Sequence, residues 1–301
     1  MIMDLRERER AGLLALLRQG NGRHWNQIAA DVSYEGSALT LLAQANEEAL
    51  FADPAALESV AEAASDIQRW SDAGLRFVTV LDDEYPARLR DIHETPPFLF
   101  YEGELRPDDQ GMSVVGSRTV SPWGVSFAEE AAALLVAREL TVISGLAAGV
   151  DAAAHRAALR LAGKTVAFLG TGMNRSYPPE NSKLQREIAE KGLLLSQFYP
   201  DAPPTKQNFP IRNAAMSGYG QASIVVEASE HSGTRIQTRV AGQHGRPVIL
   251  TTKVVDATTW GKSLAGSPNV YVVSSCEDLS AAIDAVLDRT QRVESALRAL
   301  Q

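Results

Sequence analysis

The sequence has very little cysteine and no long hydrophobic run, and each shortage excludes a class of protein. Among 301 residues there is one cysteine, Cys276, which excludes an intrachain disulfide and a zinc site built from several cysteines. No stretch reaches the roughly 18 consecutive apolar residues that a membrane-spanning helix needs. The first ten residues alternate in charge and lack the apolar centre of a signal peptide. We therefore expect a cytoplasmic protein that does not contact a membrane.

The chain also lacks an excess of positive charge. Its 29 lysines and arginines stand against 37 acidic residues, which gives a formal net charge of -8. This balance argues against a protein that coats duplex DNA by bulk charge, but it is compatible with a local basic patch. The length allows one large core with a smaller second domain.

The pattern of apolar residues changes near residue 76. Residues 1–75 carry apolar residues at helical spacing over 10–17, 37–50 and 54–73, which predicts a small all-α N-terminal domain. After it, short β-branched runs alternate with alanine-rich helical stretches, which predicts an α/β domain over 76–276. Such alternation is typical of a doubly wound, mostly parallel sheet with both faces covered. We assign 277–301 to a C-terminal helix. The expected strands are 77–81, 113–115, 140–143, 165–169, 193–196, 222–226 and 247–250.

Four loops should meet at the carboxyl ends of the parallel strands, where open α/β sheets bind their ligands. Glycines let backbone N–H groups approach an anion closely, and helix N-termini add partial positive charge. Arginines add bidentate contacts to phosphate, and an aromatic ring offers a face for base stacking. The candidate DNA- or phosphate-binding residues are Gly116, Ser117, Arg118, Ser144, Gly145, Gly149, Gly170, Thr171, Gly172, Lys206, Phe209, Arg212, Asn213, Ser232, Gly233 and Arg235.

Each candidate also has a purely structural interpretation. The glycines can serve only to permit tight turns, and Phe209 beside Pro210 can anchor a loop in the core. Asp151 can cap a helix, and Arg239 can pair with Glu227. It is the recurrence of such loops at one sheet edge that favours a binding site.

Signatures of known enzymes do not fit. A dinucleotide fingerprint fails because Arg175 stands where its third glycine belongs after Gly170-Thr-Gly172. The sequence Gly261-Lys-Ser263 imitates a phosphate-binding loop, but Asp256 stands at the position of its first glycine. No spacing supports a triad of Ser144, Asp151 and His155, so we expect no catalytic residue, no metal and no cofactor.

Seven segments resemble, in order, the DNA-processing protein A family, DprA/Smf. They include Val115-Gly-Ser-Arg118, the run from Ser144 to His155, and Leu169-Gly-Thr-Gly172. The others begin at Asp82, Tyr177, Asn208 and Val226, and the resemblance covers roughly residues 76 to 250.

The resemblance implies an extended Rossmann-like fold that binds single-stranded DNA, forms a homodimer and loads a RecA-type recombinase during DNA uptake or recombination. It implies a non-enzymatic protein whose strand contacts include Arg118, Lys206, Phe209, Arg212 and Asn213. Three departures put the recombinase role in question more than the fold. Ala148 replaces a usual arginine, Leu250-Thr-Thr-Lys253 replaces a usual Pro-Gly, and the sequence ends before a winged helix would fit.

Two other functions remain open from the sequence. The same glycine-rich fold serves nucleotide sensors and nucleotide-processing enzymes. Those enzymes carry a Pro-Gly-Gly-x-Gly-Thr signature, and Ser232-Gly-Thr-Arg235 is only a remnant of it. An interaction scaffold with a vestigial pocket is the third possibility.

Overall fold

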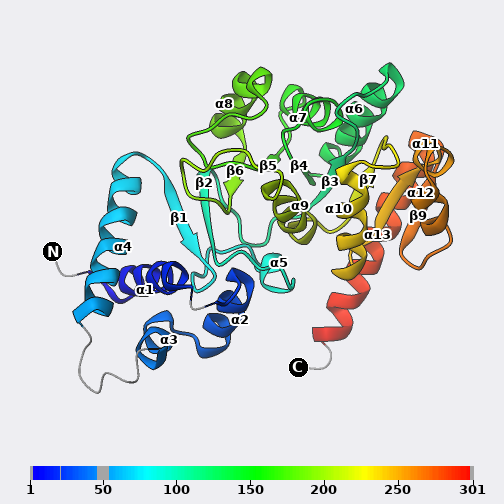
Figure 1. Cartoon of the computed structure of the whole chain (residues 1–301). Coiled ribbons are helices and arrows are strands. Elements are labelled where there is room, and N and C mark those ends of the chain that lie inside the picture. The colour runs from blue at the N-terminus through cyan, green and yellow to red at the C-terminus, as the bar shows by residue number, and fades with distance from the viewer. Residues whose placement is uncertain (1–2, 21, 46–53, 299–301) are drawn as a thin grey trace.

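The computed structural model describes residues 3–20, 22–45 and 54–298 and is built around one long sheet (Figure 1). Within this part of the chain the sheet has nine strands in the order β1-β2-β6-β5-β4-β3-β7-β8-β9. The strands from β6 to β9 in this order run parallel. At the β6 edge, β2 pairs antiparallel with β6, and β1 pairs antiparallel with β2. The strand bounds are Arg76–Thr79, Phe98–Gly103, Gly111–Val115, Thr141–Ser144, Thr165–Phe168, Leu193–Ser196, Ser223–Val225, Val248–Thr251 and Val270–Val273 for β1 to β9.

Helices cover both faces of this sheet, which is why its central strands are buried throughout. Helices α6 (Pro122–Val136), α7 (Val150–Arg160) and α13 (Cys276–Arg298) share an apolar cluster with β3, β4 and β7. Next to α7 lies α8 (Ser182–Lys191). On the opposite face, α9 (Asn208–Tyr219) contacts β5 and α10 (Gly233–Gln243) contacts β7 and β8.

The strand order reverses between β3 and β7. From β3 the chain adds β4, β5 and β6 on one side, and α9 then carries it back across the sheet to β7, β8 and β9 on the other. The loops after β3 and β7 therefore diverge, and a crevice opens between them at the carboxyl ends of the strands.

The remaining short elements complete this frame. A 3-10 turn, Pro179–Asn181, precedes α8. The short helices α5 (Ala87–Arg90), α11 (Thr252–Ala257) and α12 (Thr259–Leu264) lie between the strands along the chain.

Four helices form a separate layer beside the β1 edge (Figure 1). Helix α1 is its centre and contacts α3 and α4 most extensively. Aromatic rings join this layer to the sheet, with Trp70 4.9 Å from Phe100 and Trp25 5.3 Å from Phe98 between ring centroids. The bounds of α1 to α4 are Leu5–Gln19, Trp25–Glu35, Ala38–Ala45 and Pro54–Asp72.

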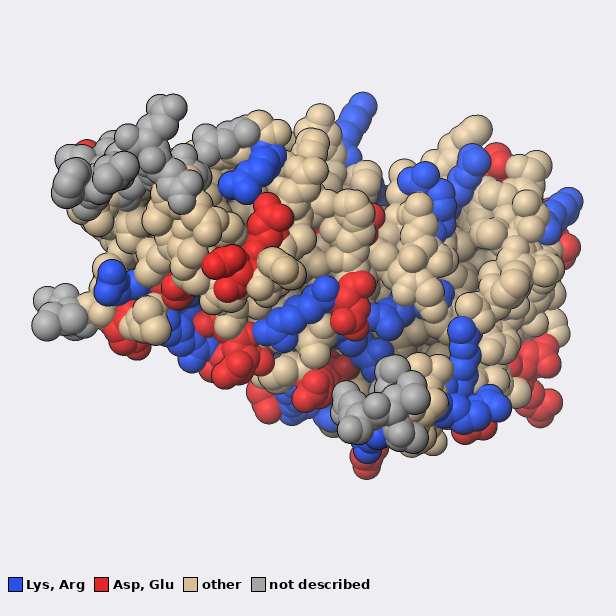
Figure 2. Space-filling view, turned by 90° about the horizontal axis from the view of Figure 1, so that it is seen from below, with Lys and Arg blue, Asp and Glu red and all other residues tan. Residues whose placement is uncertain are grey.

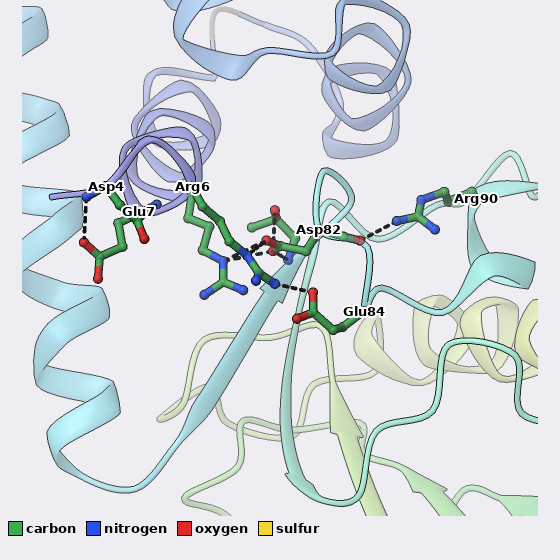
Figure 3. Close-up of polar contacts among 8 residues, drawn as sticks. Asp4, Arg6, Glu7, Asp82, Glu84 and Arg90 are labelled. Atoms are coloured by element: carbon green, nitrogen blue, oxygen red, sulfur yellow. Dashed lines mark hydrogen bonds and ion pairs between the residues drawn. The ribbon is translucent and has the colours of Figure 1, made fainter.

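A buried carboxylate fixes the helical layer to the sheet (Figure 3). Asp82, in the loop after β1, accepts hydrogen bonds from Arg6 Nε at 2.6 Å and from Arg10 Nε at 2.9 Å. The backbone N–H of Thr79 donates to the same carboxylate at 2.7 Å. Burial by itself raises the pKa of Asp82, but the hydrogen bonds from Arg10, Thr79 and Arg6 outweigh it and lower the pKa. The charged carboxylate is therefore the form that holds α1 against the loop after β1.

The predicted fold class, a doubly wound and mostly parallel sheet with a helical N-terminal region, is confirmed. All seven expected strands are present within one or two residues. The elements β2, β9 and α2 were not predicted. Part of the helix expected at 37–50 forms α3, and residues 46–53 lie outside the described residues.

Two local predictions were wrong. The residue before α7 is Gly149, at φ 80°, and Asp151 lies inside the first turn of that helix and does not cap it. Phe209, Arg212 and Asn213 lie in α9, although the sequence suggested a loop from Lys206 to Asn213. Pro210 favoured that loop prediction, but proline is well tolerated in the first turn of a helix.

Among the described helices, none combines the length and apolar character that crossing a bilayer requires.

Replacing Asp82 with asparagine should destabilise the chain by about 1–3 kcal/mol, because two arginines lose a charged partner and are only partly compensated by water. The pKa of Asp82 is lowered in the folded chain. This contribution is therefore fully present above pH ~4, near the unfolded-state value, and is lost as the pH falls through the folded-state value. Urea denaturation of the parent and the variant, at values from roughly pH 3 to roughly pH 7, measures this contribution to stability. Glu84→Gln, which removes an exposed partner of Arg6, is the control and should change stability by about 0–1 kcal/mol. Equal losses in the two variants would contradict the assignment.

Candidate nucleic-acid interface

The crevice between β3 and β7 forms a cavity of about 430 Å³. Gly116, Ser117 and Arg118 enter it from the loop after β3. Residues after β7 and in the first turns of α10 supply the opposite wall, and the first two turns of α9 supply a third. Eight of the sequence candidates line it: Gly116, Ser117, Arg118, Phe209, Arg212, Asn213, Ser232 and Gly233.

Arg212 lies at the base of this cavity and is only 5% exposed. Its Nη1 donates to the carbonyl oxygen of Phe168 at 2.9 Å, at the end of β5. Burial lowers the pKa of Arg212 to about 10, with Arg118 adding to the effect and Asp151 opposing it. The guanidinium is therefore protonated at neutral pH, and a buried positive charge faces whatever enters the cavity.

Asp151 is the negative partner of Arg212 at the same depth. Its Oδ2 accepts hydrogen bonds from the backbone N–H groups of Gly145 at 3.1 Å and Ala147 at 3.3 Å. Burial raises the pKa of Asp151, while Arg212 and these two N–H groups oppose that increase. The carboxylate thus fixes the loop after β4 and attracts Arg212 electrostatically.

Three polar side chains around the cavity have atoms that are buried and have no hydrogen-bond partner among the described residues. These atoms are Arg212 Nε, Gln237 Nε2 and Ser232 Oγ, and Gln237 is 2% exposed. A buried donor without a partner costs roughly 1–3 kcal/mol, so proteins rarely retain several in one place without a ligand. The three together suit a ligand rich in hydrogen-bond acceptors, such as a phosphate or the edge of a base.

An aromatic residue joins this cavity to a smaller one of about 170 Å³. The ring of Phe209 lies 5.3 Å from the guanidinium carbon of Arg118 and 5.5 Å from the ring of Tyr177. Gly145 and Gly170, at the ends of β4 and β5, line the smaller cavity with them. A methyl group on Gly170 would lie 2.7 Å from the Phe209 ring, so the absence of a side chain at Gly170 makes room for the ring.

The other six candidates lie outside both cavities. Ser144 is buried and donates to the Val114 carbonyl oxygen at 2.7 Å. Gly149 and Gly172 make close backbone contacts, with a hypothetical Cβ 2.3 Å from Ser117 O and 2.1 Å from Tyr199 O, respectively. Thr171 is buried, whereas Lys206 and Arg235 are exposed at the ends of α9 and α10 nearest the site.

One wall of the cavity was not predicted from the sequence. Thr234, Ile236 and Gln237 of α10 line it, and of this helix only Gly233 and the arginines had been considered. A usable signal was present, because Thr234, Gln237 and Thr238 are spaced i, i+3, i+4 and are all buried. Polar residues on the buried stripe of a helix indicate that the stripe faces something other than an apolar core.

The residues considered as enzyme signatures have structural roles. The ring of His155 is fully buried with its Nδ1 2.7 Å from Thr165 Oγ1, and burial lowers its pKa to about 3. A histidine that stays neutral in this environment is a packing residue. Gly261, Lys262 and Ser263 lie within the short helix α12 and therefore do not form a phosphate-binding loop.

The open sheet and its switch-point cavity define an extended Rossmann-like protein with a binding site for an acceptor-rich ligand. Residues 76–283 match the family model of DNA recombination-mediator protein A. The chain therefore belongs to this family, the DprA/Smf proteins.

The relatives agree with this assignment. The chain is 38% identical over 205 residues to the DNA processing protein DprA of Streptococcus pneumoniae, covering 67% of this chain and 72% of that protein. It is 36% identical over 209 residues to the protein Smf of Synechocystis, covering 68% of this chain and 49% of the relative. The match thus spans about half the length of that Smf protein.

Solved structures show the same fold. The crystal structure of the S. pneumoniae DprA superimposes with a TM-score of 0.66 at 29% identity and covers 93% of this chain and 98% of that one. The Helicobacter pylori DNA processing protein A gives a TM-score of 0.62 at 21% identity over 69% of this chain and 95% of its own.

Gly145→Ala should destabilise the chain by about 1–3 kcal/mol, because the new methyl group would lie 1.7 Å from Arg212 Nη1 and would push the buried guanidinium out of place. Gly233→Ala is the matched control at the same cavity. Its nearest neighbour would be Asn213 Nδ2 at 4.0 Å, so its stability should stay within about 0.5 kcal/mol of the parent. Chemical denaturation compares the three, and an unchanged Gly145→Ala protein would mean that Arg212 is not confined as described.

Proposed function

We propose that the chain binds single-stranded DNA in the cavity between β3 and β7 and along the adjoining Phe209 surface. The observation that carries this proposal is the set of buried donors without partners, Arg212 Nε, Gln237 Nε2 and Ser232 Oγ, next to a half-buried aromatic ring. Donors suit phosphate oxygens and base edges, and the ring suits stacking on an unpaired base. In a duplex each base is already stacked on its neighbours, so this arrangement favours single strands.

The distribution of charge supports a local rather than a general attraction for nucleic acid. On the face shown in Figure 2, basic and acidic side chains are interspersed and form no single basic field. At the proposed site, in contrast, Arg118 and Arg212 line one cavity and the exposed Lys206 lies just before α9. Attraction at this site therefore comes from a few placed cations in a chain whose net charge is -8.

Family membership supports the finer parts of the proposal. The matching family is described as a DNA recombination mediator, and the H. pylori structure is described as giving insight into the single-stranded DNA binding mode of that protein. We accordingly propose a cytoplasmic homodimer that protects single-stranded DNA and loads a RecA-type recombinase. We also propose that binding involves no catalysis, which is supported by the neutral, buried state of His155 and the engaged hydroxyl of Ser144.

The double variant Arg118→Ala/Lys206→Ala should bind a labelled single-stranded oligonucleotide more weakly and with a smaller salt dependence. Each lost phosphate contact reduces the slope of log affinity against log salt by about 0.7 on single strands. Fluorescence anisotropy over a salt series, with duplex and a nucleoside monophosphate as competitors, measures both quantities.

The matched control is Lys164→Ala/Lys191→Ala, which removes the same charge at the opposite, amino-terminal edge of the strands. Its affinity and slope should stay close to those of the parent. Equal loss in both double variants would show that bulk charge and not the site governs binding. Displacement of the strand by the nucleoside monophosphate at low concentration would instead favour a nucleotide sensor.

Phe209→Ala should weaken binding by about 1–3 kcal/mol, roughly 5- to 150-fold, because one stacking surface is lost. The salt slope should not change, since no phosphate contact is removed. Titration with a strand that carries abasic sites separates stacking from folding, because the parent and the variant should then bind alike. A persistent difference on the abasic strand would mean that Phe209 acts only by positioning Arg118.

A further inference from the structure

A second and larger cavity, of about 790 Å³, lies between the helical domain and the sheet domain. Residues at the start of α2 form one side, and residues before β2, after β6 and on α9 form the other. The hydrogen bonds from Arg6 and Arg10 to Asp82 fix the relative position of the two walls.

This cavity and the proposed DNA site are lined by neighbouring residues in the first turn of α9. Pro210 lines the cavity between β3 and β7, and Ile211 lines the larger one. The Cα atoms of these consecutive residues are about 3.8 Å apart. Ile211 is 49% exposed, although most of the helix that follows it is buried. A ligand that extends past Phe209 and Pro210 therefore reaches the rim of the larger cavity.

The lining of the larger cavity suits a flat, uncharged group with polar edges. Trp25 and Phe198 provide aromatic surface, and Pro96, Pro97 and Ile211 provide aliphatic surface. Large apolar surfaces with a few polar groups are typical of sites for small heteroaromatic ligands.

Primary amides provide part of the polar lining, beside His24, His93 and Thr95. Gln197 and Gln243 line the cavity with Asn26, whose Nδ2 already donates to the His93 carbonyl oxygen at 3.3 Å. Gln197 is only 7% exposed, and its Nε2 has no hydrogen-bond partner among the described residues. Side-chain amides of asparagine and glutamine carry a donor and an acceptor side by side and pair with the edges of bases.

The charged groups of the lining are already occupied. Arg23 is paired with Asp31 at 3.0 Å, and Glu94 is paired with His244 at 2.8 Å. Within the described part of the cavity wall, a phosphate therefore meets no uncommitted guanidinium. The uncharged part of a nucleotide fits inside, and its phosphate fits at the rim.

We infer that the larger cavity receives an unstacked nucleobase of the same DNA strand, after the strand has crossed the first turn of α9. The inference rests on the proposed function, because it needs a strand held at Arg118 and Phe209. Trp25 or Phe198 stacks on the base, and Gln197 Nε2 donates to its edge. The helical domain thereby becomes part of the DNA site.

The test compares a short strand of about 6 nucleotides with a long one of about 16, within the range of known single-strand site sizes. Gln197→Met keeps the side-chain volume and removes the amide. It should weaken binding of the long strand at least ~5-fold and leave the short strand unchanged, given the strength of a single base contact. Gln221→Met is the control, because Gln221 is equally buried but follows α9 at the opposite edge of the sheet. Equal affinities of parent and Gln197→Met for the long strand overturn the inference.

A second variant avoids any change in the buried wall. Ile211→Glu places a negative charge on the rim that the strand must cross, and Ile211→Gln is its neutral counterpart. The acidic variant should lose affinity for the long strand only, and the loss should exceed that of the neutral variant. Equal effects on short and long strands would place Ile211 in the first site and overturn the inference.

Photo-crosslinking locates the base directly. A long strand carrying one halogenated uracil at successive positions should crosslink to Trp25 or Phe198 from one position only. Crosslinks confined to the Phe209 surface overturn the inference. Displacement of the Trp25 crosslink by free deoxynucleoside monophosphate, with the strand still bound, also overturns it and assigns the cavity to a free nucleotide. If even the short strand fails to bind the parent, the proposed function fails first, and the two failures are distinguishable.

Discussion

The Arg212 guanidinium is buried against Gly145 and is attracted by the Asp151 carboxylate, and the arrangement of the proposed DNA site follows from this position. Because Arg212 donates to the end of β5 and Asp151 accepts from the loop after β4, the pair joins two strand ends to α9. A charge buried at this depth persists only with a partner, and Asp151 supplies it. Phe209, one turn earlier on α9, is thereby set in place beside Arg118.

Much of the fold could be predicted from the sequence because its strands are short, continuous apolar runs between helical stretches. The predicted parallel sheet and its seven strands rest on that regularity. The missed strands show where it fails. β2 is antiparallel and follows two prolines, and β9 lies at the sheet edge with only its last residue buried, so neither resembles a buried parallel strand.

The candidate site was predictable at the level of loops and not at the level of side-chain roles. Gly116 to Arg118 and the start of α9 do line one cavity, as the position of strand ends implied. Arg212 was expected to contact phosphate like Arg118, and the structure adds that it is buried at the base of the cavity, where its Nη1 donates to the end of β5. No sequence pattern distinguishes a buried arginine from an exposed one, because burial depends on a glycine 67 residues away in the sequence. The larger cavity could not be predicted at all, since it exists only where the helical layer meets the sheet.

Two glycines of the sheet edge face side chains of the binding site, whereas others face backbone. At Gly103 and Gly172 the obstacle to a Cβ atom is a carbonyl oxygen, which every sequence with this fold retains. At Gly145 and Gly170 the obstacle is the side chain of Arg212 or Phe209, which evolution can alter. We therefore expect each glycine and its facing side chain to be an epistatic pair. In a lineage without selection on the ring or the guanidinium, a smaller residue at 209 or 212 would free its glycine to change, and the order of the two substitutions would be fixed.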